Sequence, residues 1–155
     1  MRVLVQRVQR AQVSVEDVVV GSIDRGLLLL VGIGPEDGDA EIDWMADKVA
    51  GLRVFPSPTS KAGGMDASLL DVGGGALVVS QFTLYGDVQR GKRPSFSGAA
   101  AGPVASSRVD QFAEAIRTRG VTRVETGRFG AMMQVELVND GPVTIWIERE
   151  PKKDA

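Results

Sequence analysis

The chain has 155 residues, a length that suits one domain with a single substantial core. Its apolar share of 43% and charged share of 25% are ordinary for a globular protein, and a formal net charge of −2 argues against a protein that coats duplex nucleic acid. The lack of histidine and cysteine excludes a disulfide framework and any chemistry that needs an imidazole or a thiolate. No apolar run approaches the roughly 20 residues that cross a bilayer, and the first residues do not have the pattern of a signal peptide, so we expect a cytoplasmic protein with no membrane partner.

Short apolar segments alternate with turn residues through the first half of the chain. Four of these segments are predicted to be strands: 2–8, 13–15, 18–20 and 27–33. The second and third are expected to form a hairpin that turns at Glu16 and Asp17. Apolar residues then recur at helical spacing across residues 42–52, which predicts a helix with Asp39 as its N-cap. Residues 52–55 are expected to begin a further strand.

The second half of the chain combines loops and strands with one more helix. Residues 56–75 are rich in proline, serine and glycine, and residues 85–102 are polar and basic, so both segments predict loops. Apolar residues at helical spacing predict a helix that begins near Val109 and ends at Gly120. Four further segments are predicted to be strands: 76–84, 121–125, 132–138 and 143–148.

The expected total is seven or eight strands and two helices. Because the hairpins favour antiparallel or mixed pairing, we predict an α+β fold whose sheets form a β-barrel-like domain with two main helices on the outside. This single domain would span residues 1–150, and residues 151–155 would form a polar C-terminal tail.

The first motif with chemical potential is Ser80-Gln81-Phe82-Thr83, which follows an apolar run. One interpretation is structural: the hydroxyls bond to the backbone, and the amide of Gln81 faces solvent. The other is functional, because hydroxyl and amide groups lie beside backbone N–H groups that could bind an oxyanion, where one donor contributes roughly 3 kcal/mol of transition-state stabilisation. Polar residues that interrupt an apolar pattern are expected mainly at functional or strained sites.

A hydroxyl nucleophile at Ser80 or Thr83 would need a base within hydrogen-bond reach. Since the chain has no histidine, only a carboxylate, a lysine or a terminal amine could serve. No Ser-x-x-Lys arrangement begins at Ser80. The sequence therefore gives a nucleophilic serine or threonine little support.

The second motif is Asn139-Asp140-Gly141-Pro142, between two predicted strands. Its composition is that of a turn, and a plain hairpin accounts for it. Alternatively, the bond between Gly141 and Pro142 could be cis, the isomer found in about 5% of X-Pro bonds in folded proteins. Both carbonyls could then point the same way as a rigid pair of acceptors for an ammonium group. The residues alone leave both interpretations open.

Two apolar side chains, Phe129 and Met133, lie in a segment that begins at Gly127. Core packing is one interpretation of this pair, and pocket lining is the other. The aspartates of the loops do not have metal-ligand spacing, so we predict no metal site and no cofactor. Residues 73–75 are three glycines, but the lysine and the serine or threonine of a phosphate-binding loop do not follow them. We therefore do not expect a phosphate-binding loop there.

Taken together, the two motifs resemble the bacterial D-aminoacyl-tRNA deacylase family, of the D-tyrosyl-tRNA deacylase type. The similarity extends over nearly the whole chain through three further segments: Gln6-Arg7-Val8, Arg93-Pro94-Ser95-Phe96 and Thr126-Gly127-Arg128-Phe129-Gly130-Ala131. Each segment alone is weak, but the ordered set is highly specific. The chain departs from the family pattern at Met132 and Gly98, outside the two central motifs.

The resemblance implies a homodimer whose active sites lie at the subunit interface. The substrate would be the 3′ end of a D-aminoacyl-tRNA, with glycyl-tRNA also accepted, and its ester would be hydrolysed to proofread chirality for translation. Gly141 and Pro142 would be joined by a cis bond and would enter the partner's pocket, where their carbonyls receive the α-amino group and exclude an L side chain. The implied catalytic residues are Ser80, Gln81, Phe82 and Thr83, and the implied substrate-binding residues are Arg7, Phe129, Met133, Asn139, Gly141 and Pro142.

An aminoacyl ester is already activated, so such an enzyme needs only to position water, stabilise the oxyanion and exclude the wrong enantiomer. The vicinal 2′-hydroxyl of the terminal ribose could assist the water, with backbone N–H groups near Phe82 and Thr83 as the oxyanion site. Arg90, Lys92 and Arg93 form either a solvated loop or a patch for a few tRNA phosphates.

Three other classes remain open at this point. The chain could be a non-catalytic β domain that binds nucleic acid or a peptide. It could instead be a hydrolase of other aminoacyl esters or amides, with Thr83 as nucleophile. The third class is a purely structural dimer module, which would leave the polar residues of the two motifs without a purpose.

Overall fold

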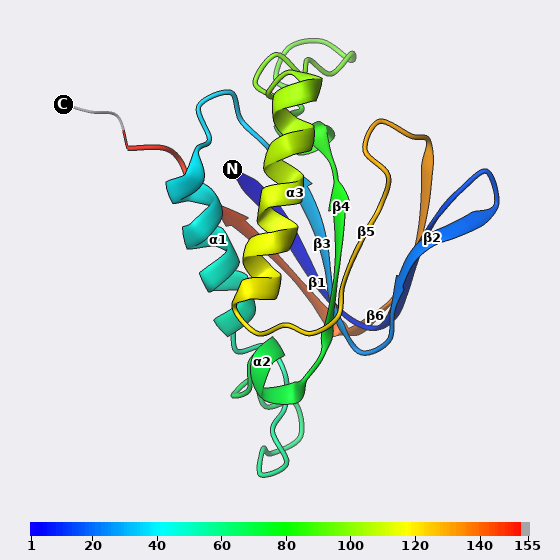
Figure 1. Ribbon diagram of the computed structural model, residues 1–155, viewed down its shortest axis with the longest axis vertical. Helices are drawn as coiled ribbons and strands as arrows, with labels where there is room; N and C mark the ends of the chain where they lie inside the picture. Colours follow the sequence, from blue (N-terminus) through cyan, green and yellow to red (C-terminus); the bar gives the residue numbers. More distant parts are fainter. Residues whose placement is uncertain (153–155) are drawn as a thin grey trace.

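A curved mixed sheet with two long helices on one face forms the protein (Figure 1). The computed structural model describes residues 1–152. In chain order the elements are β1 (Arg2–Val15), β2 (Val18–Ile23), β3 (Gly26–Gly32), α1 (Asp39–Gly51), α2 (Leu69–Val72), β4 (Gly75–Ser80), the 3-10 turn η1 (Phe82–Tyr85), α3 (Gly102–Thr118), β5 (Val124–Thr126) and β6 (Met133–Glu148).

Strand β1 is the centre of the sheet and is long enough to pair with three others. Its first half pairs antiparallel with β3, and its second half pairs antiparallel with β2. Strand β6 pairs antiparallel with β1 along nearly its whole length. Every antiparallel contact of the sheet therefore involves β1.

The remaining strands are parallel and bring the sheet almost to closure. β3 pairs parallel with β4, and β4 pairs parallel with β5. At the open side β2 approaches β5 so closely that a Cβ atom on Gly21 would lie 2.5 Å from the carbonyl oxygen of Thr126. The mixed sheet is thus nearly closed into a barrel, which confirms the predicted α+β, β-barrel-like class.

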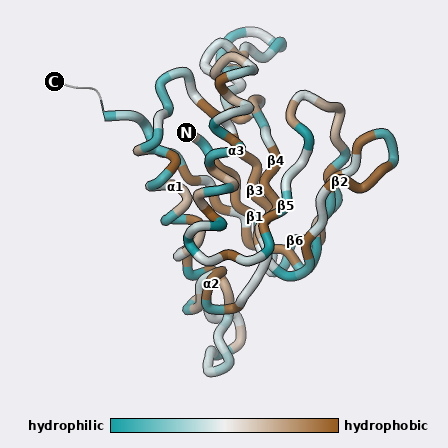
Figure 2. The backbone as a smooth tube through the Cα atoms, viewed as in Figure 1, coloured by the Kyte–Doolittle hydropathy of each residue, from teal (hydrophilic) through white to brown (hydrophobic). Residues whose placement is uncertain are grey.

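Alternation along the strands divides the buried side chains into two clusters. In β3, Leu27 and Leu29 face the helices and pack with Met45 of α1 and Phe112 of α3. Leu28 points to the opposite face, into a smaller cluster inside the curved sheet. In Figure 2 the hydrophobic colour is concentrated on the central strands beneath the helices.

The helices agree with the predicted periodicity and differ at their ends. The N-cap of α1 is Gly38 and not Asp39, which is the first helical residue. The N–H of Gly38 donates to the carboxylate of Glu41 at 3.0 Å. The loop predicted for residues 56–75 contains the short helix α2, whose Ser68 and Asp71 exchange hydrogen bonds at its start.

Several strand predictions were wrong in extent or in kind. The described residues contain six strands, and not seven or eight, because segments 2–8 and 13–15 form one continuous strand and segments 132–138 and 143–148 form another. Residues 52–55 form no strand and make only an isolated bridge between Phe55 and Ala67. Strand β5 spans only Val124–Thr126, which begins three residues later and ends one residue later than the predicted 121–125. The predicted tail 151–155 lies outside the described residues from position 153 onward.

The most informative correction concerns the segment predicted as strand 76–84. Strand β4 ends at Ser80, and the chain turns at once into η1. The turn can fold back over β3 because Gly32 has no side chain: a Cβ atom there would lie 3.2 Å from both the carbonyl oxygen of Gln81 and the Cβ of Leu84. The absence of a side chain at Gly32 therefore leaves room for the chain to turn directly after β4.

Candidate functional site

The ends of the parallel strands β4 and β5 bring the first motif and the Phe129 segment together. Both strands run in the same direction, so the residues after Ser80 and after Thr126 emerge at the same edge of the sheet. The crevice outside the carboxyl ends of parallel strands is a common place for ligands. A cavity of about 760 Å³ opens at this edge.

Six of the ten predicted site residues line this cavity: Ser80, Gln81, Phe82, Thr83, Phe129 and Met133. The cavity is mostly apolar, and its aromatic rings are accessible, since Phe82 is 56% and Phe129 is 42% exposed. Large apolar side chains that stay this open around a cavity are typical of a ligand-binding surface. Phe129 therefore fits pocket lining, whereas Met133 lines the cavity and also packs against the smaller core cluster.

The 3-10 turn η1 lines this cavity and begins with backbone N–H groups that its own hydrogen bonds leave free. The turn begins after Gln81, whose own N–H donates to the carbonyl oxygen of Val31 at 2.7 Å. Its first internal hydrogen bond runs from the N–H of Leu84 to the carbonyl oxygen of Gln81 at 3.2 Å. The N–H groups of Phe82 and Thr83 come before that bond and so have no partner within the turn.

The Thr83 hydroxyl is hydrogen-bonded to a donor and not to a base. The side-chain nitrogen of Gln81 donates to the Oγ1 atom of Thr83. An amide NH₂ group cannot take a proton from a hydroxyl. A threonine nucleophile needs a base at this position. The geometry therefore gives the Thr83 hydroxyl no activating partner.

Glycines shape the segment that delivers Phe129 to the cavity. Gly127 continues from β5 by donating its N–H to the carbonyl oxygen of Val78 at 3.0 Å. A Cβ atom on Gly127 would lie 2.7 Å from the sulfur of Met133, so the glycine allows the methionine to pack there. Gly130 has φ +76°, a left-handed conformation that favours glycine. Together they form a tight turn with Phe129 at its tip.

Sequence reasoning missed the opposite wall of the cavity. That wall consists of Phe96 and of small residues just before and at the start of α3: Ala99, Ala100, Gly102 and Ala105. The ring of Phe96 packs edge-on against Phe82, with 5.1 Å between the ring centres. The Arg93-Pro94-Ser95-Phe96 segment was the available signal, since it formed part of the resemblance without any assigned role.

The second motif is not a hairpin, which corrects one of the two interpretations drawn from the sequence. Residues 133–148 form one strand, and both parts of it pair with β1. Asn139 pairs with Val8 and Thr144 pairs with Gln6, so residues 140–143 stand opposite the single residue Arg7. The four residues form a wide bulge that projects from the sheet.

Asn139 closes this bulge from within. Its side-chain oxygen accepts a hydrogen bond from the N–H of Val143 at 3.1 Å, and its side-chain nitrogen donates to the hydroxyl of Thr144 at 2.8 Å. Within the bulge, Val143 is buried, while Gly141 and Pro142 are exposed. The bond between Gly141 and Pro142 is cis.

Arg7 holds the bulge from below. Its side chain is buried, and its Nε atom donates to the carbonyl oxygen of Asp140 at 3.0 Å. The carboxylate of Asp140 lies 3.4 Å from the same nitrogen. The Nη1 atom of Arg7 donates to the carbonyl oxygen of Val54. A Cβ atom on Gly141 would lie 3.0 Å from this guanidinium, so only glycine fits at that distance.

The predicted site residues therefore fall into two groups within one chain. One group surrounds the cavity, and the other consists of Arg7, Asn139, Gly141 and Pro142 at the bulge. None of the bulge residues lines the cavity. Strand β6 connects the two groups, because Met133 at its start lines the cavity and the bulge interrupts it further along.

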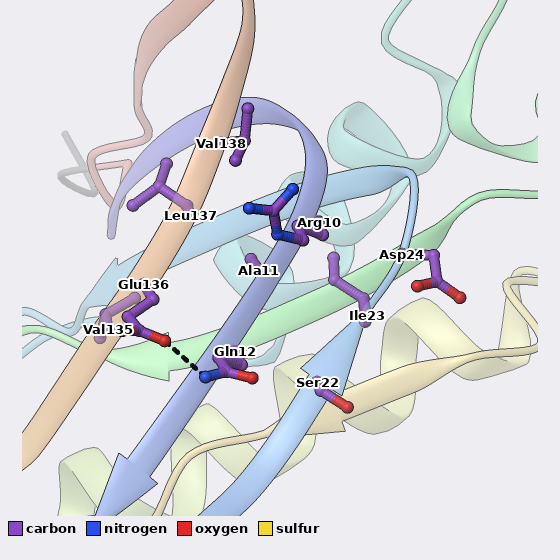
Figure 3. Close-up of a pocket in the computed structure, with 10 residues that line it drawn as sticks. All are labelled: Arg10, Ala11, Gln12, Ser22, Ile23, Asp24, Val135, Glu136, Leu137 and Val138. Carbon is purple, nitrogen blue, oxygen red and sulfur yellow. Dashed lines mark hydrogen bonds between the residues drawn. The ribbon is translucent and has the colours of Figure 1, made fainter.

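A second cavity, of about 710 Å³, lies on β6 between the two groups (Figure 3). Its walls come from β1, β2 and β6, and its polar side chains include Arg10, Asp24 and Glu136. The side-chain nitrogen of Gln12 donates to Glu136 across the strands, as the dashed line in Figure 3 marks. It contains no residue of either motif.

Basic side chains lie close to the first cavity. Arg90, Lys92 and Arg93 are exposed in a loop that two backbone hydrogen bonds between Asp87 and Ser95 close. Within residues 1–152, no ion pair includes these three cations. The same part of the chain contains no cluster of three potential metal ligands. None of its helices has both the length and the hydropathy of a membrane span.

Known proteins are similar to this chain in sequence and in architecture. A family model described as D-Tyr-tRNA(Tyr) deacylase matches residues 4–148. The D-aminoacyl-tRNA deacylase of Thermomicrobium roseum is 58% identical over 148 residues, which cover 96% of this chain and 94% of that protein. The D-aminoacyl-tRNA deacylase of Roseiflexus sp. (strain RS-1) is 56% identical over 156 residues, which cover 98% of each chain.

Solved structures add to this picture. One described as a c-Myc DNA unwinding element binding protein is 38% identical with a TM-score of 0.89, covering 97% of this chain and all of that one (100%). Another, described as a probable eukaryotic D-amino acid tRNA deacylase, is 21% identical with a TM-score of 0.82 over 94% of this chain and 97% of that one, and it supports the fold alone. Because the family model and the curated relatives cover nearly the whole chain, the family predicted from the ordered motifs is confirmed: the chain belongs to the D-Tyr-tRNA(Tyr) deacylase family.

Proposed function

We propose that this protein hydrolyses the ester of D-aminoacyl-tRNA to free tRNA and a D-amino acid, and that it also accepts glycyl-tRNA. Family membership supports the deacylase activity. The observation that carries the rest is the presence of two preformed elements in one chain, an open apolar cavity lined by the turn η1 and a braced backbone bulge in β6. Together they offer oxyanion donors and a barrier to one enantiomer in a chain that has no histidine and no cysteine.

The cavity suits the terminal adenosine of the tRNA. Its accessible rings, Phe82 and Phe129, offer stacking surfaces, and stacking on aromatic side chains is the usual way in which proteins hold unpaired bases. An adenosine bound there would bring its 3′ ester to η1. The N–H groups of Phe82 and Thr83 would then stabilise the oxyanion of the tetrahedral intermediate, at roughly 3 kcal/mol for each donor.

The proton of the attacking water needs a recipient, and the substrate itself can supply one. The 2′-hydroxyl of the terminal ribose is adjacent to the ester and can assist the water. Water adds to the carbonyl carbon, the ester bond to the 3′ oxygen breaks, and that oxygen takes up the proton. The side chain of Thr83, which is bonded to the Gln81 amide, is not consumed in this scheme.

The bulge would select the enantiomer. The exposed backbone at Gly141 and Pro142 offers carbonyl oxygens to the α-ammonium group of the substrate and has no side chain in front of it. An L residue with the same ammonium and ester positions would direct its side chain into this backbone, whereas a D residue would direct it away. Glycine has nothing to exclude and would be accepted.

These roles require a dimer, because the bulge and the cavity of one chain lie apart. Strands rise about 3.3 Å per residue, so the residues between Met133 and Gly141 span roughly 25 Å. If each bulge enters the cavity of a second copy, the contact is reciprocal. The two-fold axis then passes midway between the cavity and the bulge of one chain. The surface near that midpoint is the second cavity of Figure 3, with Arg10, Asp24 and Glu136, which we assign to the interface between copies.

The basic loop would contact the acceptor end of the tRNA. Arg90, Lys92 and Arg93 are exposed near the cavity, on the segment that leads to Phe96. Only the single-stranded end and a few phosphates need to be bound, which is compatible with an overall net charge of −2.

The decisive experiment measures deacylation of matched D-aminoacyl-, L-aminoacyl- and glycyl-tRNA by the purified protein. We expect turnover of the D-aminoacyl and glycyl esters and none of the L-aminoacyl ester. Binding without turnover of any ester would instead favour a nucleic-acid-binding domain. Equal turnover of both enantiomers would leave a hydrolase and reject the selective role of the bulge.

A further inference from the structure

Arg2 connects the first strand to the turn that carries Phe82 and Thr83, although it lines no part of the cavity. Its Nη1 atom donates to the carbonyl oxygen of Leu84, within η1, at 3.0 Å. Its guanidinium also lies over the ring of Tyr85, 4.3 Å from the ring centre. Both acceptors belong to the same turn.

The other side of the Arg2 guanidinium is fixed to the last strand. The Nε atom donates to the carboxylate of Glu148 at 2.6 Å. The ring of Trp146 lies 5.8 Å from the guanidinium carbon. Arg2 and Glu148 are also direct partners in the pairing of β1 with β6. The side chain is therefore held at two points of β6 and reaches η1 from a fixed base.

Without this arginine, the turn is held mainly from the side of β3. A Cβ atom on Gly32 would lie 3.2 Å from the ring of Tyr85, and one on Gly34 would lie 2.9 Å from its hydroxyl, so the ring packs directly on two glycines. The carbonyl of Leu84 has Arg2 of β1 as its hydrogen-bond partner.

We propose that Arg2 is a positioning residue of the site: by holding the Leu84 carbonyl and the Tyr85 ring, it fixes the orientation of the Phe82 and Thr83 N–H groups. The inference rests on the proposed function, in which these groups stabilise the oxyanion. Donors for an oxyanion act through their fixed geometry, and a displacement of about 1 Å can cost on the order of 100-fold in rate.

The charges of this cluster support a permanently formed contact. The hydrogen bond from Arg2 is the main reason that the pKa of Glu148 is lowered from its ordinary value, so the carboxylate stays ionised at neutral pH. Burial is the main reason that the pKa of Tyr85 is raised, so its phenol stays neutral. Arginine also suits the position because its planar fork can donate to two acceptors at once, whereas a lysine offers a single charged point.

The test compares Arg2→Leu and Arg2→Lys with a matched control, Arg108→Gln. Arg108 forms an ion pair with Asp39 at 2.5 Å, and its side chain is 27% exposed against 29% for Arg2, but it lies on α3 without a contact to η1. Single-turnover and steady-state deacylation of D-aminoacyl-tRNA give kcat and KM. Amide hydrogen exchange reports on the N–H groups of Leu84 and Gly86, which are bonded within and just after the turn.

We expect both Arg2 variants to lower kcat by about 10- to 100-fold with KM within two-fold of wild type, while Arg108→Gln changes neither. The Leu84 and Gly86 amides should exchange faster in the Arg2 variants alone. Wild-type kcat and unchanged exchange in Arg2→Lys would overturn the proposal, and this variant decides the question if Arg2→Leu does not fold. If the wild-type protein shows no turnover, the proposed function fails, whereas the exchange measurement still tests the contact between Arg2 and η1.

Discussion

Arg7 donates from Nε to the main-chain carbonyl of Asp140 at 3.0 Å, and the same guanidinium reaches the carbonyl of Val54 on a separate loop. One buried side chain thus ties the start of the bulge to β1 and to the segment that follows α1. The exposed tip of the bulge at Gly141 and Pro142 is held by this contact on one side and by the Asn139 amide on the other.

Replacement of Arg7 should therefore loosen enantiomer selection more than it affects hydrolysis. In Arg7→Ala the bulge loses its brace, and we expect turnover of L-aminoacyl-tRNA to rise at least ten-fold while D-aminoacyl-tRNA is still cleaved. The change leaves two carbonyls without a donor, at about 1 to 3 kcal/mol each, so the melting temperature should also fall. Parallel deacylation assays with both enantiomers measure the ratio.

Asp140→Asn is the matched control for that experiment. It weakens the ion pair at 3.4 Å but keeps the main-chain oxygen that Arg7 binds. Its selectivity should remain within about three-fold of wild type, because a partly exposed ion pair contributes only about 0.2 to 1 kcal/mol. Full selectivity in a folded Arg7→Ala protein would show that the bulge does not need this brace.

The hydroxyl of Thr83 should be dispensable, whereas the 2′-hydroxyl of the substrate should not. Thr83→Val keeps the backbone N–H and the shape of the side chain, so we expect kcat to remain within about ten-fold of wild type. A substrate with a 2′-deoxy terminal ribose should lose far more, on the order of 100- to 10,000-fold, because the proton-transfer group is missing.

The opposite pattern would identify a threonine nucleophile. If Thr83→Val removed turnover while binding and fold remained intact, substrate assistance would lose to covalent catalysis. Mass spectrometry of the quenched wild-type reaction provides an independent readout, since a nucleophile leaves an acyl group on the enzyme.

A shared active site predicts complementation between two defective subunits. Gly102→Trp should fill the cavity, because Gly102 lines it and a Cβ atom there meets nothing within 4 Å. Arg7→Ala should impair the bulge alone. A purified heterodimer of the two would have two different sites. One would join the filled Gly102→Trp cavity to the impaired Arg7→Ala bulge, and the other would join the intact cavity to the intact bulge.

We therefore expect the heterodimer to hydrolyse D-aminoacyl-tRNA with wild-type selectivity at about half the wild-type rate per dimer, one intact site in two. The Gly102→Trp homodimer should be inactive, and the Arg7→Ala homodimer should be unselective. If each site belonged to one subunit, the heterodimer would be as unselective as the Arg7→Ala protein. Differently tagged subunits allow the heterodimer to be isolated before the assay.

Binding of tRNA should depend only weakly on salt. Each phosphate contact of a single strand contributes about −0.7 to the slope of log K against log salt concentration, so three cations predict a slope of roughly −2. Arg90→Gln and Arg93→Gln should each reduce its magnitude by about 0.7, and Arg108→Gln should leave it unchanged. A wild-type slope steeper than about −6 would require an extensive contact with duplex tRNA.

Much of the fold could be predicted from periodicity, because strands that face a core must alternate or be continuously apolar. The run from Leu27 to Ile33 and the turn at Glu16 and Asp17 are examples, and both of those turn residues have the positive φ that a tight hairpin requires. The end of β4 could not be predicted, because it depends on Gly32, which is distant in sequence and simply leaves room for the returning chain.

The bulge shows the same limit for the site. Asn139 to Pro142 has the composition of a hairpin turn. The residue types alone do not reveal that the segments on both sides of it pair with the same strand, β1. The pairing partner, β1, lies more than a hundred residues away, so only tertiary structure distinguishes a bulge from a reversal. Arg2 was missed for a related reason: its contacts to Leu84 and Glu148 join residues that no local pattern connects.

Strand β1, which is the only antiparallel partner of three other strands, also determines how the molecule can come apart. When β1 leaves, β2 and β6 lose their only ladder in the described sheet, and β3 keeps only its parallel pairing with β4. The backbone amides in the middle of β1 should consequently be released only by global unfolding, so cavity and bulge persist or disappear as one cooperative unit.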